Sequence, residues 1–178
     1  MSDDDSDESE AERQPLVLDV LPHGRSDDDR PQYEKEPLAF ALDPAEFRLY
    51  ELILSEASDI SIGDPVDIYD GDRVRRASEI AYEDLPGGAQ SELDYVVEDL
   101  VAENESEFVD FYNDAQPITL RLHQLNLLPG IGKKLRNDIL DARKRRPFES
   151  FDDIESRIDG LHNPEETLVE RVLEEIRE

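Results

Sequence analysis

The sequence predicts a mixed α+β chain, with short strands in its first half and helices in its second. Between Pro15 and Pro86, short apolar runs alternate with turn-forming residues, as in small β-domains. After Gly87 the apolar residues recur at helical spacing. The first 14 residues are mostly Asp, Glu and Ser. These observations predict a disordered acidic tail (1–14), a small β-barrel domain (15–86) and an all-helical domain (87–178).

Five strands are expected in the β-domain. They are Leu16–Leu21, Leu38–Leu42, Phe47–Leu54, Val66–Tyr69 and Val74–Tyr82, with Asp70-Gly71-Asp72 as a hairpin turn between the last two. Five short strands in about seventy residues fit a small closed barrel such as the OB-fold. A small β-sandwich or an SH3-like barrel fits the same count, so the topology stays open.

Arg73, Arg75 and Arg76 form a small basic cluster near the last expected strand. One interpretation is a nucleic-acid-binding groove on the barrel. The other is a solvated edge strand that its charge keeps from aggregating. These three arginines are therefore a possible secondary site.

Two helices are expected at the start of the helical domain. The first is long and amphipathic, with its apolar face formed by Ala89, Leu93, Val96, Val97, Leu100 and Val101. The second is shorter and carries an aromatic stripe formed by Phe108, Phe111 and Tyr112. Helical spacing explains that stripe as core, without any base-stacking role.

Two more helices are expected near the C-terminus. Ser150 with Asp153 predicts the start of the first, which Gly160 ends. Asn163 and Pro164 then predict the start of the last helix, in which Glu166 occupies the favoured acidic position. Its buried face is expected to contain Leu168, Val172 and Ile176.

The helical domain is organised around a glycine-containing turn at residues 128–132. Apolar residues at helical spacing precede it (Ile118, Leu122 and Leu125) and follow it (Leu135, Ile139 and Ala142). Pro129, Gly130 and Gly132 predict a tight turn between two helices, because glycine reaches positive φ without steric cost. Bare N–H groups and the helix dipole at the start of the second helix would then bind phosphate. The alternative is an ordinary αα-hairpin, in which Pro and Gly only turn the chain.

This turn resembles the helix-hairpin-helix motif, which binds nucleic-acid backbones without reading sequence. Leu128–Lys134 matches the hairpin pattern residue for residue, and Arg145–Ile154 matches the usual continuation. The motif would occupy 117–146 and a second helical pair 150–178. The resemblance also implies that hairpin carbonyl groups can hold a monovalent cation. We expect no other cofactor and no metal-ligating set.

Charge supports a binding role for the same segment. The chain has 19 Lys and Arg against 47 Asp and Glu, a net charge of −28, yet residues 117–147 hold eight basic and two acidic side chains. Such a basic island is the electrostatic pattern expected of nucleic-acid contact. The predicted binding residues are Leu128, Pro129, Gly130, Ile131, Gly132, Lys133, Lys134, Arg136, Arg143, Lys144, Arg145 and Arg146.

The chain as a whole resembles an archaeal family known as domain of unknown function 655. The segments that carry the resemblance are Ile80–Leu85, Phe108–Asn113, Ala115–Thr119 and Arg121–Leu125. The resemblance implies an OB-like domain joined to a helix-hairpin-helix domain. It also implies a nucleic-acid-binding role without an assigned reaction, with RNA slightly favoured over DNA. The acid load and the Asp27-Asp28-Asp29 loop depart from the family and argue against a basic groove on the barrel.

The acidity has two explanations. High net charge with low hydrophobicity is typical of disorder, whereas carboxylate-rich surfaces are typical of folded proteins from salt-loving organisms. A hydrophobic content of 37% in periodic segments argues against global disorder. With the family resemblance, this predicts a protein from a halophilic archaeon. The sequence contains no cysteine, signal-peptide pattern or membrane-length apolar run, so we expect a cytoplasmic protein without a membrane partner.

Catalysis has little support in the sequence. With no Cys and three His, nucleophile–base pairs are scarce. The Gly132-Lys133 step lacks the glycine spacing and the following Ser or Thr of a P-loop. We therefore expect a non-enzymatic protein that binds nucleic acid largely independently of sequence. The alternative is a protein–protein adaptor whose basic island docks an acidic partner.

Overall fold

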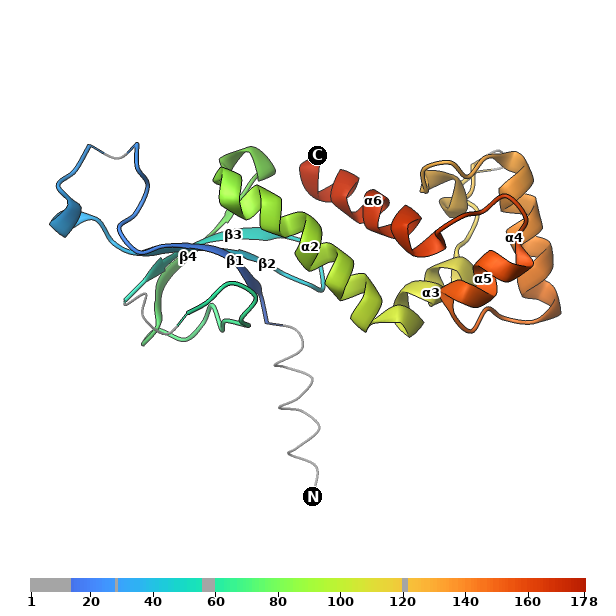
Figure 1. Cartoon of the computed structure of the whole chain (residues 1–178), viewed down its shortest axis with the longest axis horizontal. Helices are drawn as coiled ribbons and strands as arrows, with labels where there is room; N and C mark the ends of the chain where they lie inside the picture. The colour runs from blue at the N-terminus through green and yellow to red at the C-terminus, as the bar shows by residue number, and fades with distance from the viewer. Residues whose placement is uncertain (1–13, 28, 56–59, 120–121) are drawn as a thin grey trace, which may run out of the picture. The chain divides into compact units, whose positions relative to one another are not determined.

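The computed structural model describes residues 14–27, 29–55, 60–119 and 122–178. The chain divides inside helix α2 into two compact units, one extending to Val96 together with Ile176–Glu178, the other Val97–Glu175. The predicted α+β class is confirmed, because the described residues form one open antiparallel sheet and five α-helices (Figure 1). Of the expected acidic tail, only Gln14 lies within the described residues.

The first unit contains a four-stranded sheet in the order β1-β2-β3-β4, in which each strand is antiparallel to its neighbour. The strands are β1 Leu16–Leu21, β2 Leu38–Leu42, β3 Leu49–Leu54 and β4 Val74–Ile80, with 3-10 helices η1 Gln32–Glu34 and η2 Tyr82–Asp84 beside them. Consecutive residues from Ala39 to Leu42 are fully buried, so both faces of the sheet are covered. One face shares a core with Ile60, Val66 and Val74.

The prediction of a strand at Val66–Tyr69, the fourth of the five expected, is wrong, and the sheet does not close into a barrel within the described residues. This segment pairs with the start of β1 only briefly, where the Val66 N–H donates to the Pro15 carbonyl (2.9 Å). Pro65 forms an isolated bridge and has no N–H to extend the ladder. The Asp67 side chain then accepts from the Tyr69 N–H (2.9 Å), which favours a turn.

Two strand boundaries also differ from the prediction. Phe47 has a φ of +58° and lies in the turn before β3, which begins at Leu49. The last strand ends at Ile80, because Tyr82 begins η2. Residues 71–73 form the expected turn before β4. On their other side lies the turn that follows Asp67, and not the expected strand.

The second unit is helical. The helices are α2 Gly87–Glu103, which begins in the first unit, α3 Glu105–Asp114, the 3-10 helix η3 Gln124–Leu127, α4 Lys133–Arg145, α5 Phe151–Arg157 and α6 Pro164–Arg177. The predicted helix starts are confirmed: Ser150 accepts from the Asp153 N–H (3.0 Å) before α5, and Asn163 precedes α6. No helix in the described part of the chain is long and apolar enough to cross a membrane.

The aromatic stripe of α3 belongs to the core, as predicted. Tyr112 is fully buried, and its hydroxyl donates to the Pro164 carbonyl (2.7 Å) at the start of α6. Phe108 and Phe111 are half-buried. The apolar faces of α2 and α6 are also buried as expected, except that Val96 is half-buried.

Candidate nucleic-acid interface

The glycine turn, residues 128–132, connects η3 to α4 and is anchored in the core of the second unit. Leu128 and Ile131 are buried, Pro129 is half-buried, and the Ile131 N–H donates to the Leu128 carbonyl (3.2 Å). Gly130 has a φ of +81°, which favours glycine, whereas Gly132 is extended, with φ −90° and ψ −165°. Leu128 and Ile131 therefore fix the turn, and the exposed glycines present its backbone to solvent.

The helix expected before the turn is wrong. Of its predicted apolar face, Leu125 is buried, but Ile118 and Leu122 are exposed. The Ile118 N–H donates to the Leu122 carbonyl (2.8 Å), and Thr119 Oγ1 accepts from the Leu122 N–H (3.0 Å), so local bonds replace helical ones. The 3-10 helix η3 follows. Arg121, part of the predicted basic island, lies outside the described residues.

Asn126 of η3 holds the turn together. Its Nδ2 donates to the Ile131 carbonyl (3.2 Å), while its Oδ1 accepts from the His123 N–H (3.1 Å) and from the Arg136 guanidinium (3.2 Å). One side chain thus links the residue before η3, the glycine turn and the first turns of α4. No sequence pattern assigned Asn126 a role, because two of its partners lie five and ten residues away.

His123 is buried and caps the start of η3. Its Nδ1 accepts from the Leu125 N–H (3.1 Å), so this nitrogen carries no proton. Burial lowers the pKa of His123, and the positive charges of Arg143 and Arg136 lower it further.

We expect the second unit to lose stability as the pH falls from about 7.5 to about 5.5, because protonation of Nδ1 removes the cap. The pKa of His123 is lower in the folded state than in the unfolded state, where it is about 6.5. The stabilisation by the His123 cap is therefore complete above a pH of about 6.5 and is lost as the pH falls through the folded-state pKa. The loss should be about 1 kcal/mol, which is typical of a helix cap. Thermal unfolding of the wild type and of His123→Asn across this range checks it. Asn caps without titrating, so an identical pH dependence in both proteins would contradict the prediction.

Helix α4 begins without a side-chain cap. Gly132 is its N-cap residue, and the first N–H groups of the helix have no intrahelical acceptor. A Cβ built on Gly132 would meet no atom within 4 Å, and its backbone conformation suits any residue. Ser, Asp or Asn would cap a helix better than glycine. The fold therefore does not require glycine at position 132, and the start of α4 is open to an external partner.

Positive side chains surround this open helix start. Lys133 and Lys134 are exposed in the first turn of α4, which contains no acidic residue. Arg136 is half-buried, and Asn126 Oδ1 holds its guanidinium. The helix dipole disfavours cations at this end. The arrangement concentrates positive potential at the same point as the free N–H groups.

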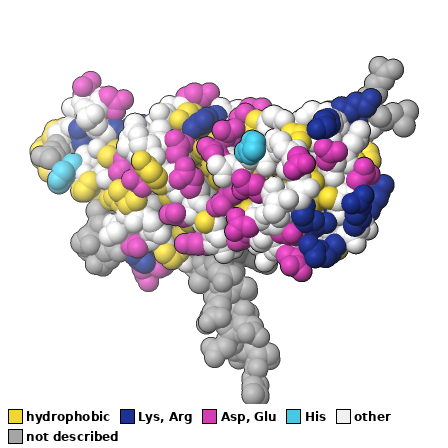
Figure 2. All heavy atoms as spheres, turned by 45° about the vertical axis from the view of Figure 1, so that its right-hand side comes forward, with side chains coloured by type: hydrophobic (Ala, Val, Ile, Leu, Met, Phe, Trp, Pro, Cys, Tyr) yellow, Lys and Arg dark blue, Asp and Glu magenta, His cyan; other side chains and the backbone are white. Residues whose placement is uncertain are grey.

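The C-terminal end of α4 carries the rest of the basic island. Arg143 is half-buried and donates to the Tyr112 carbonyl (3.1 Å). Burial lowers the pKa of Arg143, against the opposing effect of Asp114. Lys144, Arg145 and Arg146 are exposed, and Arg146 lies 3.5 Å from Asp153. Figure 2 shows Lys and Arg side chains gathered at the end of the second unit that carries α4.

Arg157 of α5 organises this end of α4, although its role was not predicted. Its Nη2 donates to the carbonyls of Ala142 (2.7 Å) and Arg146 (2.9 Å), which caps the negative end of the helix. Its Nη1 donates to Asp153 (3.2 Å), and its Cζ lies 4.6 Å from the centroid of the Phe148 ring. Burial opposes ionisation of Asp153, but a backbone hydrogen bond and the two arginines together lower its pKa. The i,i+4 spacing of Asp153 and Arg157 was the only sequence signal for this arrangement.

The possible secondary site lies in the first unit. Arg73 precedes β4, Arg75 and Arg76 belong to it, and all three are exposed. Arg75 pairs with Glu36 at 2.5 Å. Strand β4 is at the edge of the sheet, which is the position that the edge-protection interpretation requires.

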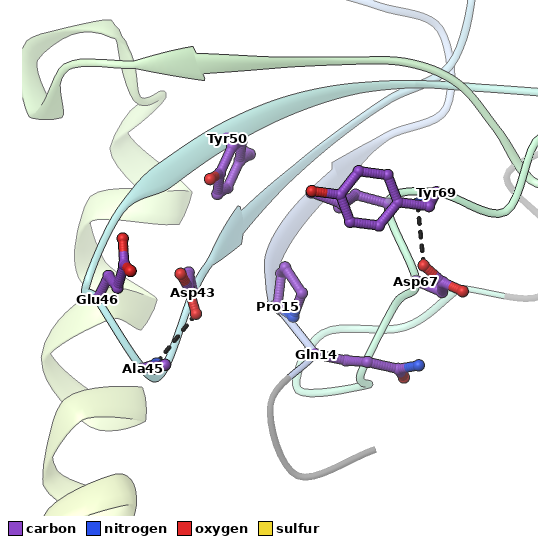
Figure 3. A pocket seen from close by; sticks show the side chains of 9 residues that line it. Gln14, Pro15, Asp43, Ala45, Glu46, Tyr50, Asp67 and Tyr69 are labelled. Carbon is purple, nitrogen blue, oxygen red and sulfur yellow. Dashed lines mark hydrogen bonds between the residues drawn. The ribbon is translucent and has the colours of Figure 1, made fainter. Parts of the chain in front are cut away.

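A hollow of about 520 Å³ opens on the first unit near the turn before β3 (Figure 3). Its charged and aromatic lining consists of Asp43, Glu46, Asp67, Tyr50 and Tyr69. Burial raises the pKa of Tyr50, and Asp43 and Glu79 add to this effect. Three carboxylates give this hollow a negative potential, which repels phosphate. Among the residues that the structure describes, no group of three or more His, Asp or Glu side chains is arranged to hold a metal ion.

The fold and the site define a mixed α+β protein with a basic, glycine-containing turn at a helix start. The chain belongs to the DUF655 family, described as protein of unknown function, whose family model matches residues 11–178. It is 41% identical over 165 residues to an uncharacterized protein of Methanocaldococcus jannaschii, in an alignment that covers 90% of this chain and 72% of the relative. It is also similar to the crystal structure of Af1531 from Archaeoglobus fulgidus, with a TM-score of 0.83, 41% identity and 93% of each chain covered. The predicted archaeal family is confirmed.

Proposed function

We propose that this protein binds the sugar–phosphate backbone of nucleic acid at the glycine turn, in the manner of a helix-hairpin-helix motif and without a catalytic step. The backbone N–H groups of Gly130, Gly132, Lys133 and Lys134 hold one phosphate. The side chains of Lys133, Lys134 and Arg136 neutralise its neighbours. Lys144, Arg145 and Arg146 extend the track, while Arg143 positions α4. Such contacts place a strand without reading its bases. RNA is the favoured polymer, following the family resemblance.

The observation that carries the proposal is the composition of the first turn of α4. Helix starts favour Asp and Glu, and 47 of the 178 residues are acidic. Helices α3, α5 and α6 each have two acidic residues in their first turn, whereas α2 and α4 have none. Of these five helices only α4 has basic residues there, Lys133 and Lys134, after the N-cap Gly132. This unfavourable helix start is explained if an external anion completes it.

We also propose that carbonyl oxygens of the same turn hold a monovalent cation. The carbonyl oxygens of Leu128, Ile131 and Gly132 each accept one hydrogen bond, from the Ile131 N–H, Asn126 Nδ2 and the Arg136 N–H. A carbonyl oxygen has two lone pairs, so one on each remains for a cation. Rings of carbonyl oxygens suit such ions.

The acid load fits adaptation to a salt-rich, halophilic cytoplasm. At about 1 M salt the Debye length is about 3 Å, so only charges in direct contact still attract phosphate. Backbone hydrogen bonds keep their strength better under these conditions, which gives the glycine turn a larger share of the affinity than the surrounding Lys and Arg.

Binding of the full chain to labelled RNA and random DNA across a salt series tests the proposal. The logarithm of the affinity should fall linearly with the logarithm of salt concentration. Lys133→Gln/Lys134→Gln should bind more weakly at low salt and reduce the slope on single strands by about 1.4, because each lost phosphate contact contributes about 0.7.

The matched control is Arg48→Gln/Arg177→Gln, which removes the same charge from exposed positions of the first unit outside both candidate sites. It should leave the slope unchanged, and an equal effect of the two double variants would show that net charge alone matters. Absence of binding at every salt concentration would overturn the proposal. An adaptor that docks an acidic protein on the basic island would then be the better interpretation.

A further inference from the structure

The second unit exposes three large aliphatic side chains just before the glycine turn. Ile118, Leu122 and Leu127 are 49%, 40% and 40% exposed. Among the described residues of this unit, no other large hydrophobic side chain is exposed. These three side chains, the aliphatic patch, all lie within ten positions of one another.

Chain connectivity and hydrogen bonds fix the aliphatic patch beside the glycine turn. Leu127 precedes Gly130 by three residues, so their Cα atoms are at most about 11 Å apart. The Ile118 N–H donates to the Leu122 carbonyl (2.8 Å), which joins the other two members of the patch. Leu122 precedes His123, whose N–H is held by the same Asn126 that binds the Ile131 carbonyl. The patch and the proposed phosphate site are therefore parts of one hydrogen-bonded assembly.

We infer that the aliphatic patch contacts the bases of unpaired nucleotides whose backbone the glycine turn holds, so that the protein prefers single-stranded segments to continuous duplex. This inference rests on the proposed function and names its substrate class. The aliphatic patch supplies apolar side chains and the start of α4 supplies Lys133 and Lys134. An unpaired nucleotide has the matching parts, a base with an apolar face and a charged phosphate. An unpaired base exposes its face, whereas stacking hides base faces within a duplex.

Insertion into a duplex is the competing use of exposed Leu and Ile. A side chain that wedges between base pairs must project from the protein, and the unstacking costs a few kcal/mol per step. Leu122 and Leu127 are more than half covered by their surroundings. Such partial burial favours contact with an already exposed base over insertion between stacked pairs.

The inference is tested by measuring binding to single-stranded and to duplex RNA at one salt concentration. The two RNA forms have equal length and composition. We expect the wild type to bind the single strand at least about tenfold more tightly. Ile118→Ser/Leu122→Ser/Leu127→Ser should lose most of that preference and change duplex affinity less than about twofold. Its salt dependence should match the wild type, because the variant removes no charge.

Ile62→Ser is the matched control, since Ile62 is 50% exposed in the first unit. Circular dichroism checks the fold, and the single variant Leu127→Gln provides the same test with a smaller change. Equal affinity of the wild type for both RNA forms, or an unchanged preference in the patch variants, overturns this inference and leaves the proposed function standing. Failure of the wild type to bind either RNA form, or random DNA, at any salt concentration overturns the proposed function itself.

Discussion

Replacing Gly132 by Asp should reduce nucleic-acid affinity at least tenfold while leaving the fold as stable as the wild type, or more stable. Asp is a favourable N-cap residue, and the interaction of its negative charge with the helix dipole stabilises the helix by about 0.3 to 1 kcal/mol. The substitution is sterically free, because a Cβ at this position meets no atom within 4 Å. Its carboxylate would occupy the position proposed for phosphate. Hydrogen bonds to charged groups contribute about 1.5 to 3 kcal/mol, or roughly ten- to a hundredfold in affinity.

Gly132→Asn is the matched variant, since it has nearly the same shape and capping capacity without the charge. We expect it to gain a similar cap and to lose much less affinity, because a phosphate can displace a neutral amide oxygen from the N–H groups but is repelled by a carboxylate. Gly130 does not offer so clean a comparison, because its φ of +81° strains any side chain introduced there. Equal losses for Gly132→Asp and Gly132→Asn would point to simple steric blockage. Unchanged binding in both would place the phosphate elsewhere.

Salt concentration separates the backbone donors from the lysines at this site. If the protein works at high salt, Gly132→Asp should cost more affinity near 1 M salt than Lys133→Gln/Lys134→Gln does. Screening has already removed much of what the lysines contribute there. Equal losses at that salt concentration would contradict a dominant role for the backbone N–H groups.

The parts of the second unit that the sequence predicts correctly are set by local chemistry. Ser150 accepts from Asp153 three residues on, and Asn163 and Pro164 begin α6, because capping depends on residues within one helical turn. Gly160 has a φ of +88°, which local sequence also indicates. These positions needed no knowledge of the surrounding fold.

The errors arise where three apolar residues were too few to define a period. Ile118, Leu122 and Leu125 match a helix over eight positions, yet Ile118 and Thr119 make local hydrogen bonds with Leu122 in place of helical ones, and two of the three apolar side chains are exposed. Val66–Tyr69 resembles a strand, but Pro65 prevents a continuing ladder with β1. Short patterns of this kind are decided by a single backbone donor or acceptor.

The structural roles of Asn126 and Arg157 could not be predicted from local sequence patterns. Asn126 acts through a carbonyl in the glycine turn and a guanidinium in α4, and Arg157 acts through carbonyls 11 and 15 residues earlier. Those partners are brought together by tertiary packing. The exposed lysines could be predicted from charge alone, but the residues that hold their helix in place could not.

Arg157→Ala should destabilise the second unit by about 2 to 4 kcal/mol, because several backbone and carboxylate groups lose one shared donor. The Ala142 and Arg146 carbonyls at the end of α4 would lose their cap, and Asp153 would lose its closest positive partner. Only 18% of the Arg157 side chain is exposed, so water replaces these bonds poorly. Thermal unfolding monitored by circular dichroism, with hydrogen exchange of α4 and α5 amides, measures the loss.

Arg157→Lys should recover little of that stability, since an ammonium group cannot reproduce the planar set of donors that reaches two carbonyls, Asp153 and the Phe148 ring together. Arg145→Ala is the control for loss of one positive charge, because Arg145 is exposed at the end of α4 that Arg157 caps. It should change stability by less than about 0.5 kcal/mol. If Arg157→Lys matched the wild type, a single charge near the helix end would suffice and the multiple hydrogen bonds would be incidental. If Arg157→Ala weakened nucleic-acid binding without altering stability, Arg157 would belong to the binding surface instead of supporting it.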